Sequence, residues 1–181
     1  MKIANNGWVS GLRKIFSPNC DARPAGVAID LLVIHNISLP PDQFGGKAIT
    51  DFFTNNLDTT AHPYYEHIKC VKVSAHFLIQ RDGLIIQFVP CTKRAWHAGA
   101  SAWRERSACN DFSLGVELEG SDNTPFSDQQ YAALVRLTRR LMRTYPIRDI
   151  VGHSDIAPQR KTDPGPFFQG LRNRARTRLV L

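Results

Sequence analysis

The sequence lacks the features of membrane-spanning and secreted proteins. It contains no run of about 18 apolar side chains, the length that marks a bilayer-spanning helix. Its first eight residues, Met1 to Trp8, include a lysine, two asparagines and a glycine where a secretory signal has a continuous apolar stretch. We therefore expect a cytoplasmic protein without a membrane partner.

Cysteine pairs are also missing. The four cysteines Cys20, Cys70, Cys91 and Cys109 include no Cys-x-x-Cys arrangement of the kind found in zinc ribbons and thiol redox sites. The 181 residues show no repeat, low-complexity tract or linker, so we expect four reduced thiols and one domain over residues 1–181. A domain of this size buries roughly 70% of the surface of its unfolded chain. It needs no structural metal, and any metal is expected to be catalytic.

Acidic residues are scarce only in the last quarter of the chain. The formal net charge of +7 suggests a nucleic-acid binder, but residues 1–135 hold 12 basic and 13 acidic side chains against 11 and 3 in residues 136–181. No aromatic residues alternate with the basic ones for stacking on single strands. We therefore expect a solvated helix face, a basic tail at 169–181 and no nucleic-acid partner. Eight arginines make up most of the excess: Arg136, Arg139, Arg140, Arg143, Arg172, Arg174, Arg176 and Arg178.

Short apolar runs between turn residues predict the strands. Asp82-Gly83 is a two-residue hairpin signal between two of them. The alternation in 114–119 places Glu117 and Glu119 on one face of a strand. The predicted strands are 31–35, 74–81, 84–89, 114–119 and 149–153.

Helical patterns lie between these strands. Ser127 and Gln130 form a capping-box signature ahead of an apolar stripe that ends at Pro146, which predicts a helix over 127–145. Shorter helices are predicted at 47–55 and 7–16. The interspersed helices and strands indicate an α/β (α+β) single domain with a central mixed β-sheet flanked by helices.

Three side chains near strand ends could bind a metal ion. His35 and His153 end apolar runs, and Asp163 follows in a loop. Two neutral imidazoles and a carboxylate would give Zn²⁺ three protein ligands and leave a fourth position for water. The spacing alone does not distinguish this site from a chance set, because the chain holds six histidines and no His-Glu-x-x-His helix.

Two further charged residues could assist chemistry there. Pro164 favours an extended backbone before it, which turns Lys161 to the same side as Asp163. The lysine could stabilise an oxyanion, although a surface Lys-Asp pair has the same pattern. Glu117 could act as a general base, unless its strand face is solvated. His76 and His97 lie among apolar residues, and we leave both out of the metal site.

Seven segments, in the same order, resemble the cytoplasmic zinc amidases of bacterial cell-wall recycling. These enzymes act on 1,6-anhydro-N-acetylmuramyl-L-alanine and belong to a family that also contains phage amidases and peptidoglycan-recognition proteins. The resemblance covers about residues 8–168. The segments are 35–41, 61–64, 73–76, 94–99, 109–113, 117–120 and 160–166, which read HNISLPP, AHPY, VSAH, RAWHAG, CNDFS, ELEG and RKTDPGP.

The resemblance implies a role for each candidate residue. His35, His153 and Asp163 match the zinc ligands of the family, and Glu117 matches its catalytic carboxylate. Lys161 matches the residue that assists at the oxyanion. The implied reaction is zinc-dependent hydrolysis of the amide between the lactyl group of N-acetylmuramic acid and L-Ala in muropeptides, by a monomer.

At some of the positions that would contact substrate, the sequence departs from the residues usual in the family. Asn36 resembles a substrate-contacting position. Family members usually carry an arginine directly before Cys-Asn-Asp, where this chain has Ala108. Lys72 stands where an arginine is usual, and a lysine offers a point charge in place of a two-pronged fork. We expect Lys72 and Arg106 to meet peptide carboxylates.

Two other readings stay open. A peptidoglycan-binding module of the same fold would not cleave its ligand, although such relatives replace a zinc ligand and this chain keeps all three. An amidase acting on intact cell wall would need export, for which no signal is present in the sequence.

Overall fold

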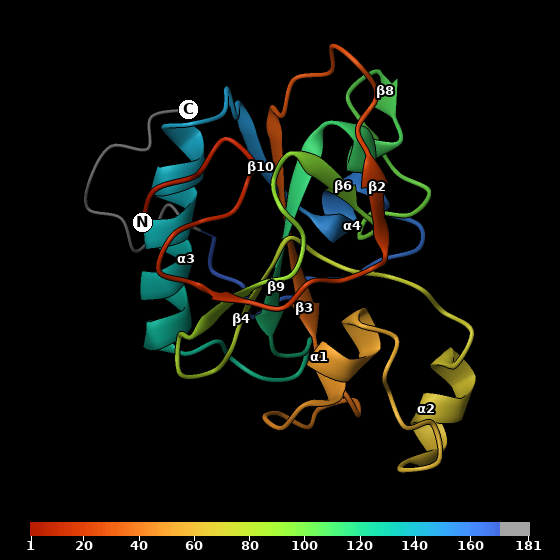
Figure 1. The fold of residues 1–181 in the computed structure, drawn as a ribbon. Coiled ribbons are helices and arrows are strands. Elements are labelled where there is room, and N and C mark those ends of the chain that lie inside the picture. Colours follow the sequence, from red (N-terminus) through yellow and green to blue (C-terminus); the bar gives the residue numbers. More distant parts are fainter. Residues whose placement is uncertain (171–181) are drawn as a thin grey trace.

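A six-stranded mixed sheet forms the centre of the protein (Figure 1). The computed structural model describes residues 1–170. The strand order is β1-β5-β4-β9-β3-β10, with β4 and β5 antiparallel and the other neighbours parallel. The strands are β1 (Arg13–Lys14), β3 (Leu31–Ile37), β4 (Phe77–Ile79), β5 (Ile85–Gln87), β9 (Ser113–Glu119) and β10 (Asp149–Gly152).

Smaller elements surround this sheet. Two strand pairs, β2 with β6 and β7 with β8, form separate two-stranded sheets. Their bounds are β2 (Cys20–Ala22), β6 (Lys93–Ala95), β7 (Ala102–Trp103) and β8 (Arg106–Ser107). The helices are α1 (Ala48–Phe53), α2 (Pro63–Ile68), α3 (Asp128–Met142), α4 (His153–Ile156) and the 3-10 turn η1 (Cys109–Asp111). None of the helices in residues 1–170 is long and apolar enough to cross a bilayer.

Helix α3 covers one face of the sheet (Figure 1). Ser127 caps it, because its Oγ accepts from the Gln130 amide while the Gln130 side chain accepts from the Ser127 amide. This is the capping box predicted from the sequence. The apolar stripe of α3 packs on the side chains of β3 and β9 that point to this face, which are Leu32, Ile34, Leu114, Val116 and Leu118.

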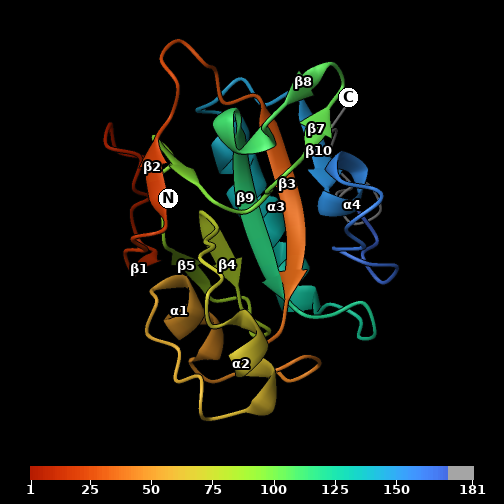
Figure 2. The same cartoon turned by 90° about the vertical axis from the view of Figure 1, so that its right-hand side faces the viewer.

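The opposite face of the sheet carries two apolar clusters and, between them, polar residues. One cluster contains Leu31 and Val33 with Ile156 of α4. The other lies under α1 and α2 and begins, along β3, beyond His35. Figure 2 shows α1 and α2 at one end of β3 and α4 beside β10. Because side chains alternate along a strand, His35 lies on the same face as Leu31 and Val33.

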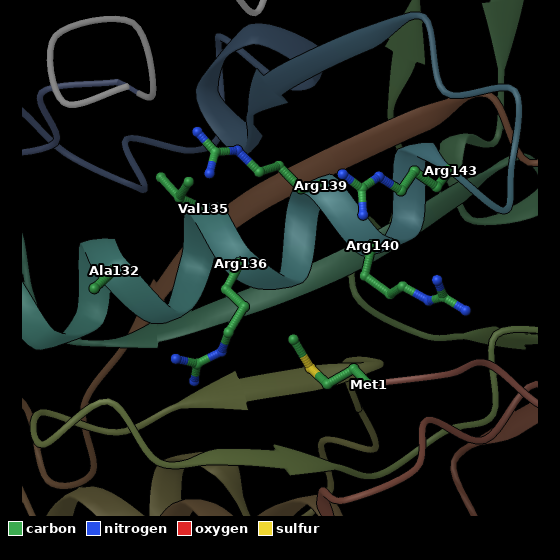
Figure 3. Close-up of a pocket in the computed structure, with 7 residues that line it drawn as sticks. All are labelled: Met1, Ala132, Val135, Arg136, Arg139, Arg140 and Arg143. Atoms are coloured by element: carbon green, nitrogen blue, oxygen red, sulfur yellow. The ribbon is translucent and has the colours of Figure 1, made fainter. Parts of the chain in front are cut away.

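The arginines of α3 lie away from the sheet, as predicted from the helical spacing. Figure 3 shows Arg136 and Arg140 on the side of α3 that faces Met1, and Arg139 and Arg143 on the other side. Together with Met1 they line a surface hollow of about 530 Å³. The predicted basic tail lies, from residue 171 on, outside the residues that the structure describes.

The structure confirms the mixed sheet, a hairpin around Asp82-Gly83, the predicted strands and the helices near 47–55 and 127–145, with shifted ends. The hairpin loop is longer than the two residues predicted, because Ile79 pairs with Ile85 and the Gln80 amide donates to the Leu84 carbonyl. The predicted helix at 7–16 is wrong. Gly7 and Gly11 have φ of 85° and 77°, in the left-handed region. The buried Gln87 side chain holds this segment, accepting from the Val9 amide and donating to the Gly7 carbonyl. Such side-chain bonds to the backbone replace the hydrogen bonds of a helix.

Candidate metal centre

Three potential ligand atoms converge among the polar residues between the two apolar clusters, on the face of the sheet opposite α3. His35 is on β3, His153 begins α4 directly after β10, and Asp163 lies in the following loop. The Nδ1 atoms of His35 and His153 are 3.0 Å apart, and Asp163 Oδ2 lies 3.0 Å from the first and 3.1 Å from the second. The structure therefore brings together the three residues predicted as metal ligands, and they form a group that could hold a metal ion.

The hydrogen bonds behind these imidazoles indicate which atoms face the centre. His153 Nε2 lies 3.2 Å from the Ala98 carbonyl oxygen, which only accepts, so this nitrogen carries the proton. His35 Nε2 lies 2.9 Å from His97 Nδ1 and can donate to it. Both Nδ1 atoms then present lone pairs towards each other and towards the Asp163 carboxylate. Three converging lone pairs repel one another unless a cation lies between them.

The charge states agree with this arrangement. Burial lowers the pKa of His35 to about 4, against the opposing effect of the nearby Asp163. Burial alone would raise the pKa of Asp163, but its contacts with His153 and His35 outweigh burial and hold that pKa well below its usual value. Neutral imidazole and ionised carboxylate are the forms that bind a metal.

The ligand distances fit a small tetrahedral ion. Bonds of about 2.0–2.1 Å at tetrahedral angles place ligand atoms about 3.3 Å apart, close to the observed 3.0–3.1 Å. Zn²⁺ prefers nitrogen and carboxylate ligands in this geometry, and three protein ligands leave its fourth position open. The residues present therefore fit zinc.

Glu117 lies beside this group. It is the register partner of His35 on β9, is 9% exposed and lines the same cavity as the three ligands. Its Oε2 is buried without a hydrogen-bond partner among the described residues. Burial, reinforced by Asp163 and opposed by Lys161, raises the pKa of Glu117 well above its usual value. Such a carboxylate is poised to accept a proton.

Glu119, on the same strand face, has a different environment. Its two carboxylate oxygens accept from the backbone amides of Gly45 and Arg81, at 2.6 and 3.1 Å. It is 2% exposed. The alternative that Glu117 and Glu119 lie on a solvated strand face is therefore wrong. Glu119 has a structural role, whereas Glu117 Oε2 has no hydrogen-bond partner among the described residues.

The cavity around the centre is open and mixed in character. It measures about 370 Å³. Lys161 and Asn36 line it together with the ligands, and Asn36 also donates to Asp122 Oδ1 at 2.7 Å. Its apolar wall includes Leu39, Phe52, Tyr64, Ile68 and Val71.

The two basic residues expected to meet peptide carboxylates lie in different places. Lys72 is exposed and lines a neighbouring cavity of about 240 Å³, which shares Phe52, Ile68 and Val71 with the first. Arg106 lies outside both cavities. It pairs with Asp30 at 2.9 Å and its guanidinium stacks over Phe112 at 3.9 Å.

His97 is a site residue that the sequence interpretation left out. Its ring contacts His35 edge to face, with centroids 5.0 Å apart, in addition to the hydrogen bond. No spacing rule links residues 62 positions apart. The one available signal was the segment RAWHAG, which belongs to the resemblance but carried no assigned role.

Comparisons with known proteins agree with this geometry. A family model described as N-acetylmuramoyl-L-alanine amidase matches residues 25–166. The 1,6-anhydro-N-acetylmuramyl-L-alanine amidase AmpD of Escherichia coli (strain K12) is 51% identical over 174 residues, 95% of each chain. The Haemophilus influenzae protein of the same name is 51% identical over 171 residues, 93% of each chain.

Solved structures show the same relationship. A selenomethionine derivative of AmpD superposes with a TM-score of 0.88 at 51% identity, covering 91% of this chain and 93% of that chain. AmiD from E. coli, in complex with the substrate anhydro-N-acetylmuramic acid-L-Ala-D-gamma-Glu-L-Lys, superposes with a TM-score of 0.57 at 34% identity, covering 81% of this chain and 57% of that chain. Because the family model matches most of its length and about half of its residues are identical to those of the AmpD proteins, the chain belongs to the N-acetylmuramoyl-L-alanine amidase family.

Proposed function

We propose that the protein hydrolyses the amide between the lactyl group of 1,6-anhydro-N-acetylmuramic acid and L-Ala in cytoplasmic muropeptides, with zinc as its cofactor, during peptidoglycan recycling. The observation that carries this proposal is the convergence of His35, His153 and Asp163 beside the unpartnered Glu117. The names of relatives that span 95% of the chain support the substrate class.

His35, His153 and Asp163 would hold the zinc ion. Zinc in such a site polarises the scissile carbonyl and makes water acidic enough to attack near neutral pH. The protein's part is to keep the His35 imidazole neutral, which burial does, and the Asp163 carboxylate ionised, which its contacts with the two histidines do against the effect of burial.

Glu117 would move the proton. Its Oε2 has no competing hydrogen-bond partner among the described residues, and it faces the cavity that holds the ligands. It can take a proton from the attacking water and pass it to the nitrogen of the leaving L-Ala. A raised pKa favours the second step, because the protonated carboxyl is then stable enough to donate.

Lys161 and Asn36 would contact the substrate. The Lys161 ammonium lines the cavity with Glu117 and Asp163, where it can stabilise the oxyanion of the tetrahedral intermediate. Asn36 keeps its side-chain oxygen available while its nitrogen donates to Asp122. Lys72 lines the adjoining cavity together with Lys69, and a stem peptide that extends into this cavity would meet their positive charge. Arg106 is engaged elsewhere and has no part in this proposal.

A hydrolysis assay tests the proposed substrate. The purified protein is incubated with 1,6-anhydro-muropeptides and with ordinary muropeptides of matching stem length, and the released peptides are quantified. We expect peptides with a free L-Ala amino terminus, released faster from the anhydro sugar. Binding without release of any peptide would favour the peptidoglycan-binding module and would overturn the proposed hydrolysis.

A further inference from the structure

Two segments of the chain have no role in the chemistry above, yet they are hydrogen-bonded to each other beside the metal ligands. They are residues 94–99 (RAWHAG) and 109–113 (CNDFS). We propose that His97 and Ala98 position the two metal-ligating imidazoles, and that Asn110 holds His97 and Ala98 in place. This inference rests on the metal site proposed above.

The first step is the contact with the ligands. His97 Nδ1 lies 2.9 Å from His35 Nε2, and the carbonyl of the next residue, Ala98, accepts from His153 Nε2 at 3.2 Å. Each imidazole therefore has its distal nitrogen bound by one of two consecutive residues. A hydrogen bond at that nitrogen selects the tautomer and the ring orientation in which the other nitrogen faces the metal.

The second step is the anchoring of these two residues. Asn110 Oδ1 accepts from the backbone amides of both His97 and Ala98, at 3.1 and 2.9 Å. Asn110 is itself fixed, because the partly buried Arg23 guanidinium donates to its carbonyl at 3.0 Å and to the Ser113 carbonyl at 2.8 Å. One amide oxygen thus sets the position of both contacts to the ligands.

The third step concerns the position of the His97 ring, which is restricted by Ser113 and Gly115 of β9. Its Nε2 is 3.2 Å from Ser113 Oγ. The adjacent strand residue is Gly115, and a Cβ there would lie 2.5 Å from His97 Cγ. Any side chain at position 115 would therefore push the imidazole out of reach of His35.

The loop of the third ligand is tied to the same segment. Arg160, three residues before Asp163, donates from Nη2 to the carbonyls of Ala98 and Ala100, both at 2.9 Å. The Ala98 carbonyl therefore serves two partners, His153 and Arg160. All three ligands are linked to residues 97–100, although they lie up to 128 positions apart in the chain.

His76 shows that this arrangement is more than the burial of a histidine. It is buried like His97, at 0% against 8% exposed, and its ring lies next to that of His97, with centroids 5.8 Å apart. However, its Nδ1 accepts from the Gly115 amide, and its Nε2 faces the Lys93 carbonyl and the Arg23 guanidinium. His76 therefore contacts no metal ligand through its nitrogens, whereas His97 Nδ1 contacts His35.

Zinc affinity, measured by competition with a chromogenic chelator, tests the proposal on the full chain. His97→Leu removes the acceptor for His35, and we expect affinity to fall by about 10–100-fold, the usual effect of losing such a partner. His97→Asn keeps an oxygen near the position of Nδ1 and should recover most of the affinity. His76→Leu disturbs a neighbouring buried histidine and should leave affinity within about threefold of the wild type, whatever it does to the unfolding of the metal-free protein.

The outcomes separate this inference from the proposed function. Tight zinc binding by the wild type with equal affinity in His97→Leu would overturn only the positioning role, as would an equal loss in His97→Leu and His97→Asn. Failure of the wild type to bind zinc would overturn the metal site itself. If His97→Leu does not fold, Asn110→Ala and Asn110→Asp form the corresponding pair. There, weaker binding in Asn110→Ala that recovers in Asn110→Asp supports the proposal, and equal binding in both contradicts it.

Discussion

At the scale of single residues, the surroundings of Glu117 differ most from those of an ordinary carboxylate. It is buried, one of its oxygens has no partner among the described residues, and Asp163 adds negative charge nearby. Leaving a polar atom unpaired costs stability, commonly about 1–3 kcal/mol. A proton-transfer role explains why the fold keeps such a group, whereas Glu119 on the same strand is fully bonded to backbone amides.

Replacement of Glu117 should separate metal binding from turnover. In Glu117→Ala we expect zinc content equal to that of the wild type, because the carboxylate is not one of the three ligands, and a turnover reduced by about 10²-fold or more. Metal analysis and the peptide-release assay on one preparation measure both quantities. Unchanged turnover would assign the proton transfer to another residue.

The metal ligands could be inferred from the sequence, but the residues that hydrogen-bond to these ligands and hold them in place could not. His35 and His153 end apolar runs of the sequence and Asp163 precedes a proline, and the resemblance assigns them as ligands. The contact between His97 and His35 depends on a loop folding back across β9 and on the missing side chain of Gly115. The location of Arg106 beside Asp30, outside the two cavities, likewise depends on how the β7-β8 pair folds.

At the scale of elements, the sequence predicted those helices and turns that are stabilised by interactions between residues close together in the chain. Asp82-Gly83 makes its hairpin because Gly83 takes a φ of 83°, which glycine adopts without strain. Helix α3 starts at Ser127 because two side chains satisfy its first amides. The segment 7–16 was mispredicted because a distant residue, Gln87, supplies its hydrogen bonds.

The cap of α3 gives a prediction about stability alone. Ser127→Ala removes the bond to the Gln130 amide and the bond from Ser127 Oγ to the Arg81 carbonyl. We expect the free energy of unfolding in urea to fall by about 0.5–2 kcal/mol, the usual cost of losing a cap. Turnover under folding conditions should be unchanged, because α3 covers the face of the sheet opposite to the metal centre.

Thr144→Ala serves as the control for this change. Thr144 is exposed just beyond the end of α3, and its hydroxyl donates to the Arg140 carbonyl. Its loss should change the free energy of unfolding by less than about 0.5 kcal/mol. Equal effects of the two substitutions would mean that the cap does not contribute to stability as the structure indicates.

At the scale of the whole molecule, the fold keeps several histidines neutral in its interior. Burial lowers the pKa of His35 to about 4, and burial also lowers the pKa of His76 and of His97 well below its usual value. The unfolded chain binds protons at these side chains near pH 6.5. The stability that depends on neutral histidine is therefore complete above pH 6.5 and is lost as the pH falls towards 4.

We accordingly expect the metal-free protein to be less stable at pH 5 than at pH 7.5. Glu117 acts in the opposite direction, because its raised pKa makes the folded state bind a proton more tightly as the pH falls, but it is one group against three histidines. Urea unfolding of chelator-treated protein at the two pH values measures the difference. A free energy of unfolding that is equal or higher at pH 5 would show that the histidines are not held neutral.

The central claim is that His35, His153 and Asp163 hold the zinc ion on which hydrolysis depends. The most direct test measures zinc content and muropeptide hydrolysis on the same preparations of the wild type and Asp163→Ala. We expect one zinc per chain and turnover in the wild type, and neither in the variant, because two imidazoles alone leave the site incomplete. Stoichiometric zinc with normal turnover in Asp163→Ala would contradict the assignment.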